Sequence, residues 1–355
     1  GLKRMAADYA GKVPPPECAP STGKRIAVVG GGPGGLSAAY YLQLMGHQTT
    51  VFEMLPKLGG TLRYGIPNYR LPKDRLDEDI QAILETGVQV EFGKRIGKDI
   101  TIQSLRQEYD AVLISIGAST DKKLGIEGEH AEGVISAVSF LRDVGEDKSP
   151  DLTGQEVAVI GGGNVSMDAV RTAKRLGAKK VSIVYRRRVA DMTALPGEID
   201  GAVAEGIELQ TLKAPSSIDV DENHHVKGIY VTPQMVSSIR DGRASIKPTG
   251  EEDIYIPCDV LIVAIGQNIE THHFEQAGIP VERGKIITKS TGAFENLPGV
   301  FAGGDCASGP ASVIKAIAAA KVVAANIDEY LGYHHEISCD VEIPEAHLDD
   351  RTPCG

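Results

Sequence analysis

Three glycines and one acid near the start of the chain have the spacing of a dinucleotide-binding turn. Gly30, Gly32 and Gly35 follow the apolar run at residues 26–29, and the next apolar run ends in Glu53. In this arrangement the first glycine allows a tight turn, the second lets the backbone approach a pyrophosphate, and the third lets a helix pack closely on a strand. The phosphates bind at the helix N-terminus, and the carboxylate accepts hydrogen bonds from a ribose diol. The pattern predicts a strand, a glycine turn, a helix and a second strand.

The same unit recurs from residue 156, but it ends with the opposite charge. Gly161 and Gly163 take the places of the first two glycines, and Ser166 replaces the third with another small residue. The strand that follows ends in the sequence YRRR at residues 185–188. Arginine at this place accommodates a ribose 2′-phosphate, and guanidinium groups also stack on adenine. The two units predict two nucleotide-binding domains, with NADP(H) in the second and a different dinucleotide in the first. The alternative for the arginines is a solvated basic turn.

Length and charge restrict the class of protein further. The 355 residues suffice for two domains with separate cores, and 41 glycines suit an α/β protein with many tight turns. The net charge of −11 argues against nucleic acid or an anionic membrane as the main partner. No apolar run reaches about 18 residues, and the first residues contain no apolar signal core. We therefore expect a cytoplasmic protein that does not insert into a membrane.

The cysteines and histidines give no redox pair and no metal site by their spacing. The five cysteines stand at positions 18, 258, 306, 339 and 354, and none forms a C-x-x-C pair. The sequence therefore encodes neither a local redox disulfide nor a four-cysteine iron–sulfur site. We expect the histidines at positions 47, 224, 225, 272, 273, 334 and 335 to lie on the surface, and we assign metal ligation to none of them.

Strand and helix patterns alternate over most of the chain and indicate an α/β fold with two Rossmann-like domains. A helix is expected at residues 76–85, and strands at 88–92, 111–116, 259–265 and 299–305. A β-rich region, with strands at 227–232 and 254–257 separated by a polar stretch at 237–252, is expected to be antiparallel and peripheral. An alanine-rich helix should end near residue 331.

With these motifs in place, the chain resembles the small (beta) subunit of NADPH-dependent glutamate synthase. That family also includes the NADPH-binding subunit of electron-bifurcating transhydrogenases and the reductase part of dihydropyrimidine dehydrogenase. The motifs that carry the resemblance are GGGPGGLSAAYYL, LGGTLRYGIPNYRLPK, GGGNVSMDAVRTA, VYRRR, AIGQ and GVFAGGDCASGPASVIKAIAAAK. They cover roughly residues 2–331, and YGIPNYRLPK is the most specific because generic two-dinucleotide flavoproteins lack it.

The resemblance implies a discontinuous FAD-binding domain at residues 22–128 and 290–331, interrupted by an NADP(H)-binding domain at 129–289. An N-terminal helix and linker would occupy residues 1–21, and a C-terminal arm residues 332–355. The residues that would hold FAD lie in the glycine turn, along the flavin and its phosphates, and in the late GD motif and the helix start after it. They are Gly30, Gly32, Pro33, Gly34, Gly35, Glu53, Gly60, Thr61, Leu62, Arg70, Ile96, Gly117, Gly304, Asp305, Ala311, Ser312 and Val313.

The resemblance implies specific roles for Asp305 and for residues 311–313. By the resemblance, Asp305 binds the ribityl chain or a phosphate, and its alternative role is an N-cap for the last helix. Residues 311–313 would present backbone N–H groups to the flavin's pyrimidine edge, where the helix dipole favours the negative charge of the reduced ring.

NADP(H) would contact the second glycine turn, the arginines and the last strand of the second domain. The phosphates would lie at Gly161, Gly163, Asn164, Val165 and Ser166, the 2′-phosphate at Arg186 and Arg187, and the nicotinamide side at Ala264, Ile265 and Gly266.

The resemblance also implies electron transfer beyond this chain. Relatives carry an N-terminal cysteine-rich segment with two [4Fe–4S] clusters, which is missing from this sequence. We expect either a fragment of a longer polypeptide or a partner subunit that supplies the clusters. Hydride transfer from nicotinamide C4 to flavin N5 needs stacking and orientation, so no catalytic side chain is assigned. The expected function is an NADPH:FAD electron-entry module of a multisubunit enzyme, with both a glutamate synthase and an electron-bifurcating complex left open.

Three other classes of protein share parts of this pattern. A flavoprotein disulfide reductase would need a C-x-x-C near the flavin, which the sequence lacks. An oxidase or monooxygenase would need a substrate pocket that the sequence does not reveal. A structural subunit that binds nucleotides without turnover is disfavoured by the intact glycine, arginine and aspartate positions.

Overall fold

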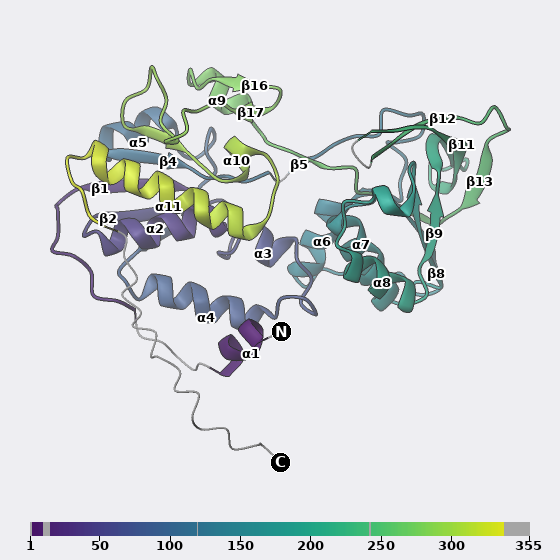
Figure 1. The fold of residues 1–355 in the computed structure, drawn as a ribbon, viewed down its shortest axis with the longest axis horizontal. Helices are drawn as coiled ribbons and strands as arrows, with labels where there is room; N and C mark the ends of the chain where they lie inside the picture. Colours follow the sequence, from purple (N-terminus) through teal and green to yellow (C-terminus); the bar gives the residue numbers. More distant parts are fainter. Residues whose placement is uncertain (1, 10–14, 119, 241–242, 337–355) are drawn as a thin grey trace, which may run out of the picture.

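Two five-stranded parallel sheets, one in each of two domains, form the core of the molecule (Figure 1). The computed structural model describes residues 2–9, 15–118, 120–240 and 243–336. Helices cover both faces of the first sheet, whereas the second sheet has helices on one face and an antiparallel sheet on the other. The structure confirms the predicted α/β fold class with two dinucleotide-binding domains.

The first domain has the strand order β3-β2-β1-β4-β18. These strands are β1 (Arg25–Val29), β2 (Gln48–Glu53), β3 (Gln89–Phe92), β4 (Ala111–Ile114) and β18 (Val300–Ala302). One face packs against α2 (Pro33–Leu44) and α11 (Val313–Tyr330), and Leu36, Leu42 and Ile327 share a core with Ile26. Strands β1 and β4 are neighbours although the chain leaves them in opposite directions. The carboxyl ends of such a strand pair form the crevice where α/β sheets bind ligands.

The opposite face of the first sheet is covered by α5 (Ile102–Glu108) and by a segment that contains α9 (His272–Gln276), β16 (Val281–Glu282) and β17 (Lys285–Ile286). Phe274, Ile279 and Ile286 are buried against Val112 and Ile114 of β4. The chain therefore rejoins the first domain soon after residue 268, whereas we expected residues 129–289 to belong to the second. Short strands with few apolar residues hid this packing from the sequence pattern.

The second domain has the strand order β9-β8-β7-β14-β6. Its strands are β6 (Val134–Ser136), β7 (Glu156–Ile160), β8 (Lys180–Tyr185), β9 (Glu208–Thr211) and β14 (Val260–Val263), and the covering helices are α6 (Ala137–Gly145), α7 (Asn164–Arg175) and α8 (Pro196–Ala204). An antiparallel sheet of β10 (Lys213–Val220), β11 (Val226–Arg240), β12 (Arg243–Pro248) and β13 (Ile254–Pro257) packs on the other face through Ile229 and Val231. The expected antiparallel region is therefore present, but the polar stretch at 237–252 forms part of a hairpin instead of a separator.

Two short strands carry the chain between the domains. β5 (Thr120–Asp121) leaves the first domain and pairs antiparallel with β15 (Gln267–Asn268), which returns to it. Close packing of α6 on α3 (Thr61–Tyr64) adds a contact, because a Cβ at Gly145 would lie 2.8 Å from the Arg63 carbonyl oxygen. α4 (Lys73–Leu84) follows α3, and the loop between them faces the second domain.

The two ends of the chain differ in how much of them the structure describes. The expected N-terminal helix is α1 (Leu2–Tyr9), and α10 (Asp305–Ser308) precedes α11, which ends at Tyr330 close to the predicted residue. Most of the expected C-terminal arm, residues 337–355, lies outside the described part of the chain. Among the described residues, no helix is both long and apolar enough to span a membrane.

Candidate dinucleotide sites

The first glycine turn joins β1 to α2 at the crevice between β1 and β4. Gly30 has φ +110°, and a Cβ there would collide with the carbonyl oxygen of Ser115 at the end of β4. A Cβ at Gly35 would collide with the Gly30 carbonyl oxygen, so the helix can approach the strand only without a side chain. Gly32, by contrast, faces open space, with Gly60 Cα at 3.8 Å from a built Cβ. The three positions thus have the properties expected of the turn, the approach and the packing glycine.

Glu53 lies beneath this turn at the end of β2. Its carboxylate accepts a hydrogen bond from Gly31 N at 2.7 Å and another from Leu55 N at 2.8 Å. The side chain is 6% exposed, and burial raises its pKa although the backbone bonds lower it. Each carboxylate oxygen has a further lone pair, so Glu53 can brace the turn and still accept a ribose hydroxyl.

Other predicted FAD residues line the same edge of the first sheet. Gly60 starts α3, and a Cβ there would lie 2.7 Å from Gly32 Cα, so the two backbones face each other closely. Gly117 has φ +66° and no atom within 4 Å of a built Cβ. Ser115, which the sequence analysis did not single out, lies between Gly34 and Gly304, with its hydroxyl 2.7 Å and 3.4 Å from Cβ atoms built at them. Its only signal in the sequence is its place directly after a buried strand.

The late motif contributes residues at the start of α10 and α11. Burial raises the pKa of Asp305, and a hydrogen bond from Ala311 N opposes that shift. Asp305 is the first residue of α10, and Ser312 is the N-cap of α11, where its hydroxyl accepts from Lys315 N. The N-cap of α11 is therefore Ser312, so the alternative role that we gave Asp305 is taken by another residue.

The remaining predicted FAD residues differ in their surroundings. Pro33 and Gly34 lie in the first turn of α2, and Thr61 and Leu62 in α3. Val313 begins α11, and Ala311 precedes its N-cap. Ile96 packs at the edge of the core on the α9 face. Arg70 is the exception, because its guanidinium binds two carboxylates of the second domain.

The second glycine turn repeats the geometry of the first. Gly161 has φ +147°, and a Cβ there would collide with the Ala264 carbonyl oxygen at the end of β14. Gly163 is open, with its nearest neighbour, Thr193 Oγ1, at 3.4 Å from a built Cβ. Ser166 is fully buried against the turn, as the small third residue should be. The side chain of Asn164 accepts from Leu195 N at 2.9 Å, and Val165 is the next residue of α7.

The end of β14 forms the other wall of the second crevice. Ile265 is 39% exposed, and Gly266 has φ +127°, with the Lys122 side chain 3.3 Å from a built Cβ. Lys122 follows β5 and was not expected at the site. The second crevice is thus built from the glycine turn, the Ala264–Gly266 edge and a lysine from the interdomain strand.

The three arginines after β8 differ in their hydrogen-bond and ion-pair partners. Arg188 makes a bidentate pair with Asp191 at 2.8 Å and 2.9 Å. Arg186 is exposed and has no hydrogen-bond or ion-pair partner among the described residues. The Nε of Arg187 is buried without a partner. Buried guanidinium nitrogens are normally paired, so an orphan donor beside an exposed arginine fits an anionic ligand such as a 2′-phosphate.

One group of histidines differs from the sequence-based expectation. His47 is fully buried, and its Nε2 donates to Asp328 Oδ1 at 2.8 Å. His335 donates to the same carboxylate through its ring at 2.8 Å and its backbone at 2.7 Å. The prediction that His47 lies on the surface is wrong, because its carboxylate partner stands 281 residues away and no local pattern reveals it.

Known proteins are similar to this chain in sequence. Residues 24–320 match the pyridine nucleotide-disulphide oxidoreductase family. The chain is 38% identical over 358 residues to the NADP(+)-dependent formate dehydrogenase subunit beta of Moorella thermoacetica, covering 93% of this chain and 50% of that protein. It is 36% identical to the NADPH-Fe(3+) oxidoreductase subunit beta of Geobacter sulfurreducens, over 93% of this chain and 54% of the relative. The glutamate synthase [NADPH] small chain of Escherichia coli is 33% identical, with coverage of 87% and 69%.

Solved structures have the same fold. FprA from Mycobacterium tuberculosis in complex with NADPH superposes with a TM-score of 0.74 at 22% identity, covering 87% of this chain and 85% of that one. The thioredoxin reductase of Lactococcus lactis has a TM-score of 0.64 at 20% identity, with coverage of 87% and 99%. The chain spans about half the length of the first two curated relatives. These comparisons confirm the expected oxidoreductase class, and the chain belongs to the pyridine nucleotide-disulphide oxidoreductase family.

Proposed function

We propose that the chain is the NADPH-linked electron-entry module of a multisubunit enzyme. Bound FAD would accept a hydride from NADPH and release the electrons singly to iron–sulfur centres outside this chain. The observation that carries the proposal is the pair of similar crevices that differ in charge. A buried glutamate closes the first. Beside the second lie Arg186, which has no side-chain partner among the described residues, and Arg187, whose buried Nε is unpaired.

The residues of each crevice supply binding and orientation. In the first, the backbone of Gly30 to Gly35 would bind the pyrophosphate, Glu53 the ribose, and Asp305 the ribityl chain or a phosphate. The backbone N–H groups at the start of α11 would face the flavin's pyrimidine edge. In the second, the start of α7 would bind the NADPH pyrophosphate, and Arg186 and Arg187 its 2′-phosphate.

The identity of the partner is a separate question. The relatives are named as subunits of a formate dehydrogenase, an Fe(III) oxidoreductase and a glutamate synthase. We propose that this chain delivers electrons from NADPH to iron–sulfur subunits in either a glutamate synthase type of complex or an electron-bifurcating one. [4Fe–4S] clusters would be carried by a further segment of the polypeptide or by the partner.

An anaerobic titration tests the nucleotide assignment. Protein reconstituted with FAD is titrated with NADPH and separately with NADH while flavin absorbance is recorded. Arg186→Ala should weaken the response to NADPH by about 10- to 100-fold, because one charge-assisted phosphate contact contributes about 1.5–3 kcal/mol. The response to NADH should be unchanged. Lys179→Ala, at the exposed opposite end of β8, is the matched control and should behave like the unmodified protein.

Three results would count against the proposal. An equal response of the unmodified protein to NADPH and NADH would remove the 2′-phosphate assignment. Failure to bind FAD, or a flavin that does not bleach with either nucleotide, would leave a nucleotide-binding scaffold without turnover. Rapid reoxidation by oxygen without transfer to a one-electron acceptor such as ferricyanide would favour an oxidase.

A further inference from the structure

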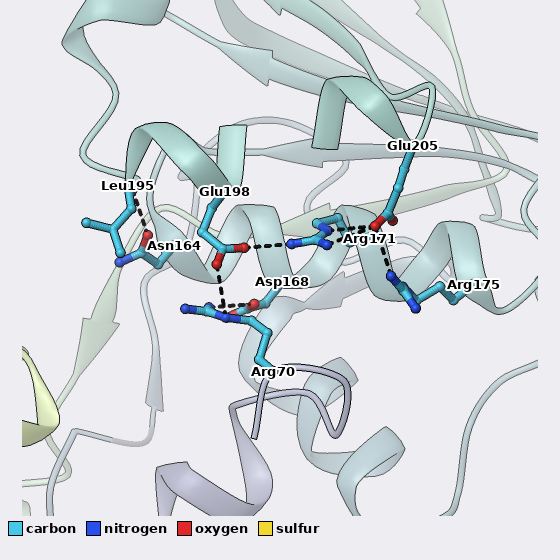
Figure 2. A network of polar contacts seen from close by, with 8 residues as sticks. All are labelled: Arg70, Asn164, Asp168, Arg171, Arg175, Leu195, Glu198 and Glu205. Carbon is cyan, nitrogen blue, oxygen red and sulfur yellow. Dashed lines mark hydrogen bonds and ion pairs between the residues drawn. The ribbon is translucent and has the colours of Figure 1, made fainter. Parts of the chain in front are cut away.

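The loop between α3 and α4 reaches across the domain boundary and binds two helices of the second domain (Figure 2). Arg70 Nη1 lies 2.8 Å from both carboxylate oxygens of Asp168, in α7. Its Nε lies 3.3 Å from Glu198, in α8. One arginine of the first domain therefore contacts both helices at once.

The contact continues into the second domain as a charged network. Glu198 also accepts a hydrogen bond from Arg171 Nη1 at 2.7 Å. Arg171 and Arg175 both donate hydrogen bonds to Glu205 (Figure 2). Tyr69, next to Arg70, lies under these arginines, with ring-to-guanidinium distances of 4.9 Å and 4.1 Å. We call Tyr69, Arg70 and these five partners on α7 and α8 the interdomain clamp.

Burial makes the clamp sensitive to the loss of one charge. Asp168 is 4% exposed, and the side chain of Glu198 is 19% exposed. Without the Arg70 guanidinium, two acids would face the first domain, and Asp168 would lack the donor that now binds both of its oxygens. A buried carboxylate that loses its partner is strongly destabilised where it stands, so the interface would open to hydrate it.

The clamp is coupled to the candidate NADP(H) site through the same two helices. α7 begins at Asn164, in the second glycine turn, and the Asn164 side chain accepts from Leu195 N just before α8 (Figure 2). The glycine turn, the start of α7 and the start of α8 thus form one connected unit. Because Arg70 binds this unit at Asp168 and Glu198, it fixes the direction in which the turn faces the first domain.

The other connections between the domains are two short strands and the packing of one helix. Within the described residues the chain passes between the domains at β5 and β15, of two residues each, and α6 packs on α3. Two paired residues per strand brace the crossing over a short length, so side-chain contacts contribute to the orientation of the domains. Hydride transfer requires the donor and acceptor rings to be aligned, and a misplacement of about 1 Å can cost about a hundredfold in rate.

We propose that Arg70 is a positioning residue, whose pairing with Asp168 and Glu198 holds the second domain in the orientation needed for hydride transfer. This inference rests on the proposed NADPH-to-FAD function. It also replaces the sequence-based assignment of Arg70 to the flavin and its phosphates with a role at the domain boundary. The guanidinium is engaged by two carboxylates of the second domain, so its effect should appear in the rate of reduction and not in nucleotide binding.

The test compares Arg70→Met, which keeps the length and removes the charge, with Arg70→Lys and Asp168→Asn. Arg75→Met, on the exposed side of α4 a few residues away, is the matched control. Flavin content, the Kd for NADPH and the flavin reduction rate at saturating NADPH are measured anaerobically by stopped flow. X-ray scattering of the nucleotide-free proteins reports the separation of the domains independently of turnover.

For Arg70→Met we expect normal flavin content, a Kd for NADPH within about threefold, and a reduction rate lower by about tenfold to a hundredfold. The radius of gyration should increase. Asp168→Asn should act in the same direction, Arg70→Lys should restore part of the rate, and Arg75→Met should match the unmodified protein. Asp168→Asn also serves if Arg70→Met fails to fold.

Three outcomes would overturn the inference. An unchanged reduction rate and unchanged scattering in both Arg70→Met and Asp168→Asn would show that the pair does not position the domain. Loss of flavin from Arg70→Met, with Asp168→Asn unaffected, would return Arg70 to the flavin phosphates. An equal loss in Arg75→Met would make the effect non-specific. If NADPH reduces none of the proteins, the proposed function fails, while the scattering still decides whether the clamp sets the domain arrangement.

Discussion

The substitutions Gly32→Ala and Gly163→Ala should each weaken nucleotide binding at one site and leave binding at the other site unchanged. Both glycines have extended backbone angles that alanine adopts freely, with φ −81° and ψ −177° at Gly32 and φ −101° and ψ 178° at Gly163. A Cβ would lie 3.8 Å from its nearest neighbour at the first and 3.4 Å at the second. The protein without nucleotide therefore has room for either methyl.

The expected change in the free energy of unfolding is small. Both glycines are N-caps, where alanine is less favourable than glycine by several tenths of a kcal/mol. Replacing glycine by alanine also reduces the entropy of the unfolded chain, which stabilises by about 0.4–1 kcal/mol. The two effects oppose each other, so unfolding should shift by less than about 1 kcal/mol.

The effect on nucleotide binding should be larger. Each methyl would stand where the backbone must approach a pyrophosphate, and the loss of one charge-assisted hydrogen bond costs about 1.5–3 kcal/mol. The corresponding Kd rises by about 10- to 100-fold. Gly32→Ala should weaken FAD and leave NADP⁺ binding intact, and Gly163→Ala should do the reverse, so each variant is the control for the other.

The assay combines three measurements on the same preparations. FAD binding is followed by fluorescence quenching, NADP⁺ binding by calorimetry, and unfolding by urea. Gly35→Ala is the contrasting variant, because its Cβ would collide with the Gly30 carbonyl oxygen and should destabilise the fold itself. Wild-type FAD affinity in Gly32→Ala, or loss of both nucleotides in either N-cap variant, would refute the reasoning.

Two further predictions concern buried carboxylates. Burial raises the pKa of Asp328, but hydrogen bonds from His335 and His47 outweigh it and lower the pKa, so its ionised form stabilises the fold above about pH 4 and loses that effect as pH falls. Asp328→Asn should lower the free energy of unfolding in urea by about 3–5 kcal/mol at pH 7 and by less at pH 3. Asp151→Asn, at an exposed position, is the control and should lower it little. An equal loss for Asp328→Asn at both pH values would contradict this prediction. For Asp168 the sign is opposite: burial raises its pKa to about 6, against the Arg70 bond, so the unmodified protein should lose stability relative to Asp168→Asn as pH rises from about 4 to about 6. A difference between the two that is constant over this range would show that Asp168 does not titrate there.

The Rossmann units could be predicted because their signals are local. A buried strand, glycines at fixed offsets and an amphipathic helix all lie within some thirty residues, and the structure shows collisions at Gly30, Gly35 and Gly161 that require those glycines. The predicted end of the alanine-rich helix is also close to the observed end, because its apolar positions recur at the helical period and stop near Tyr330.

Features that depend on distant partners could not be predicted in the same way. Arg70 and Asp168 are 98 residues apart. The resemblance assigns Arg70 to FAD, and no local pattern marks Asp168 as its partner. The sequence predicts a polar separator where β11 and β12 form a hairpin, because much of the hairpin surface is exposed and shows no alternation of apolar residues. The return of residues 269–289 to the first sheet depends on a few large side chains, such as Phe274, that occur without a period.

The inserted position of the second domain also fixes an order of events during synthesis. All five strands of the second sheet exist once Val263 has been added, whereas the first sheet lacks β18, and α2 lacks its packing partner α11, until the chain has passed residue 330. Because domains fold as units while the chain emerges, the second domain can be complete on the ribosome before the first. In that interval β4 presents an unpaired edge, which invites pairing with other chains. A chain that stalls between residues 264 and 300 would thus release a finished second domain attached to an open, aggregation-prone first one.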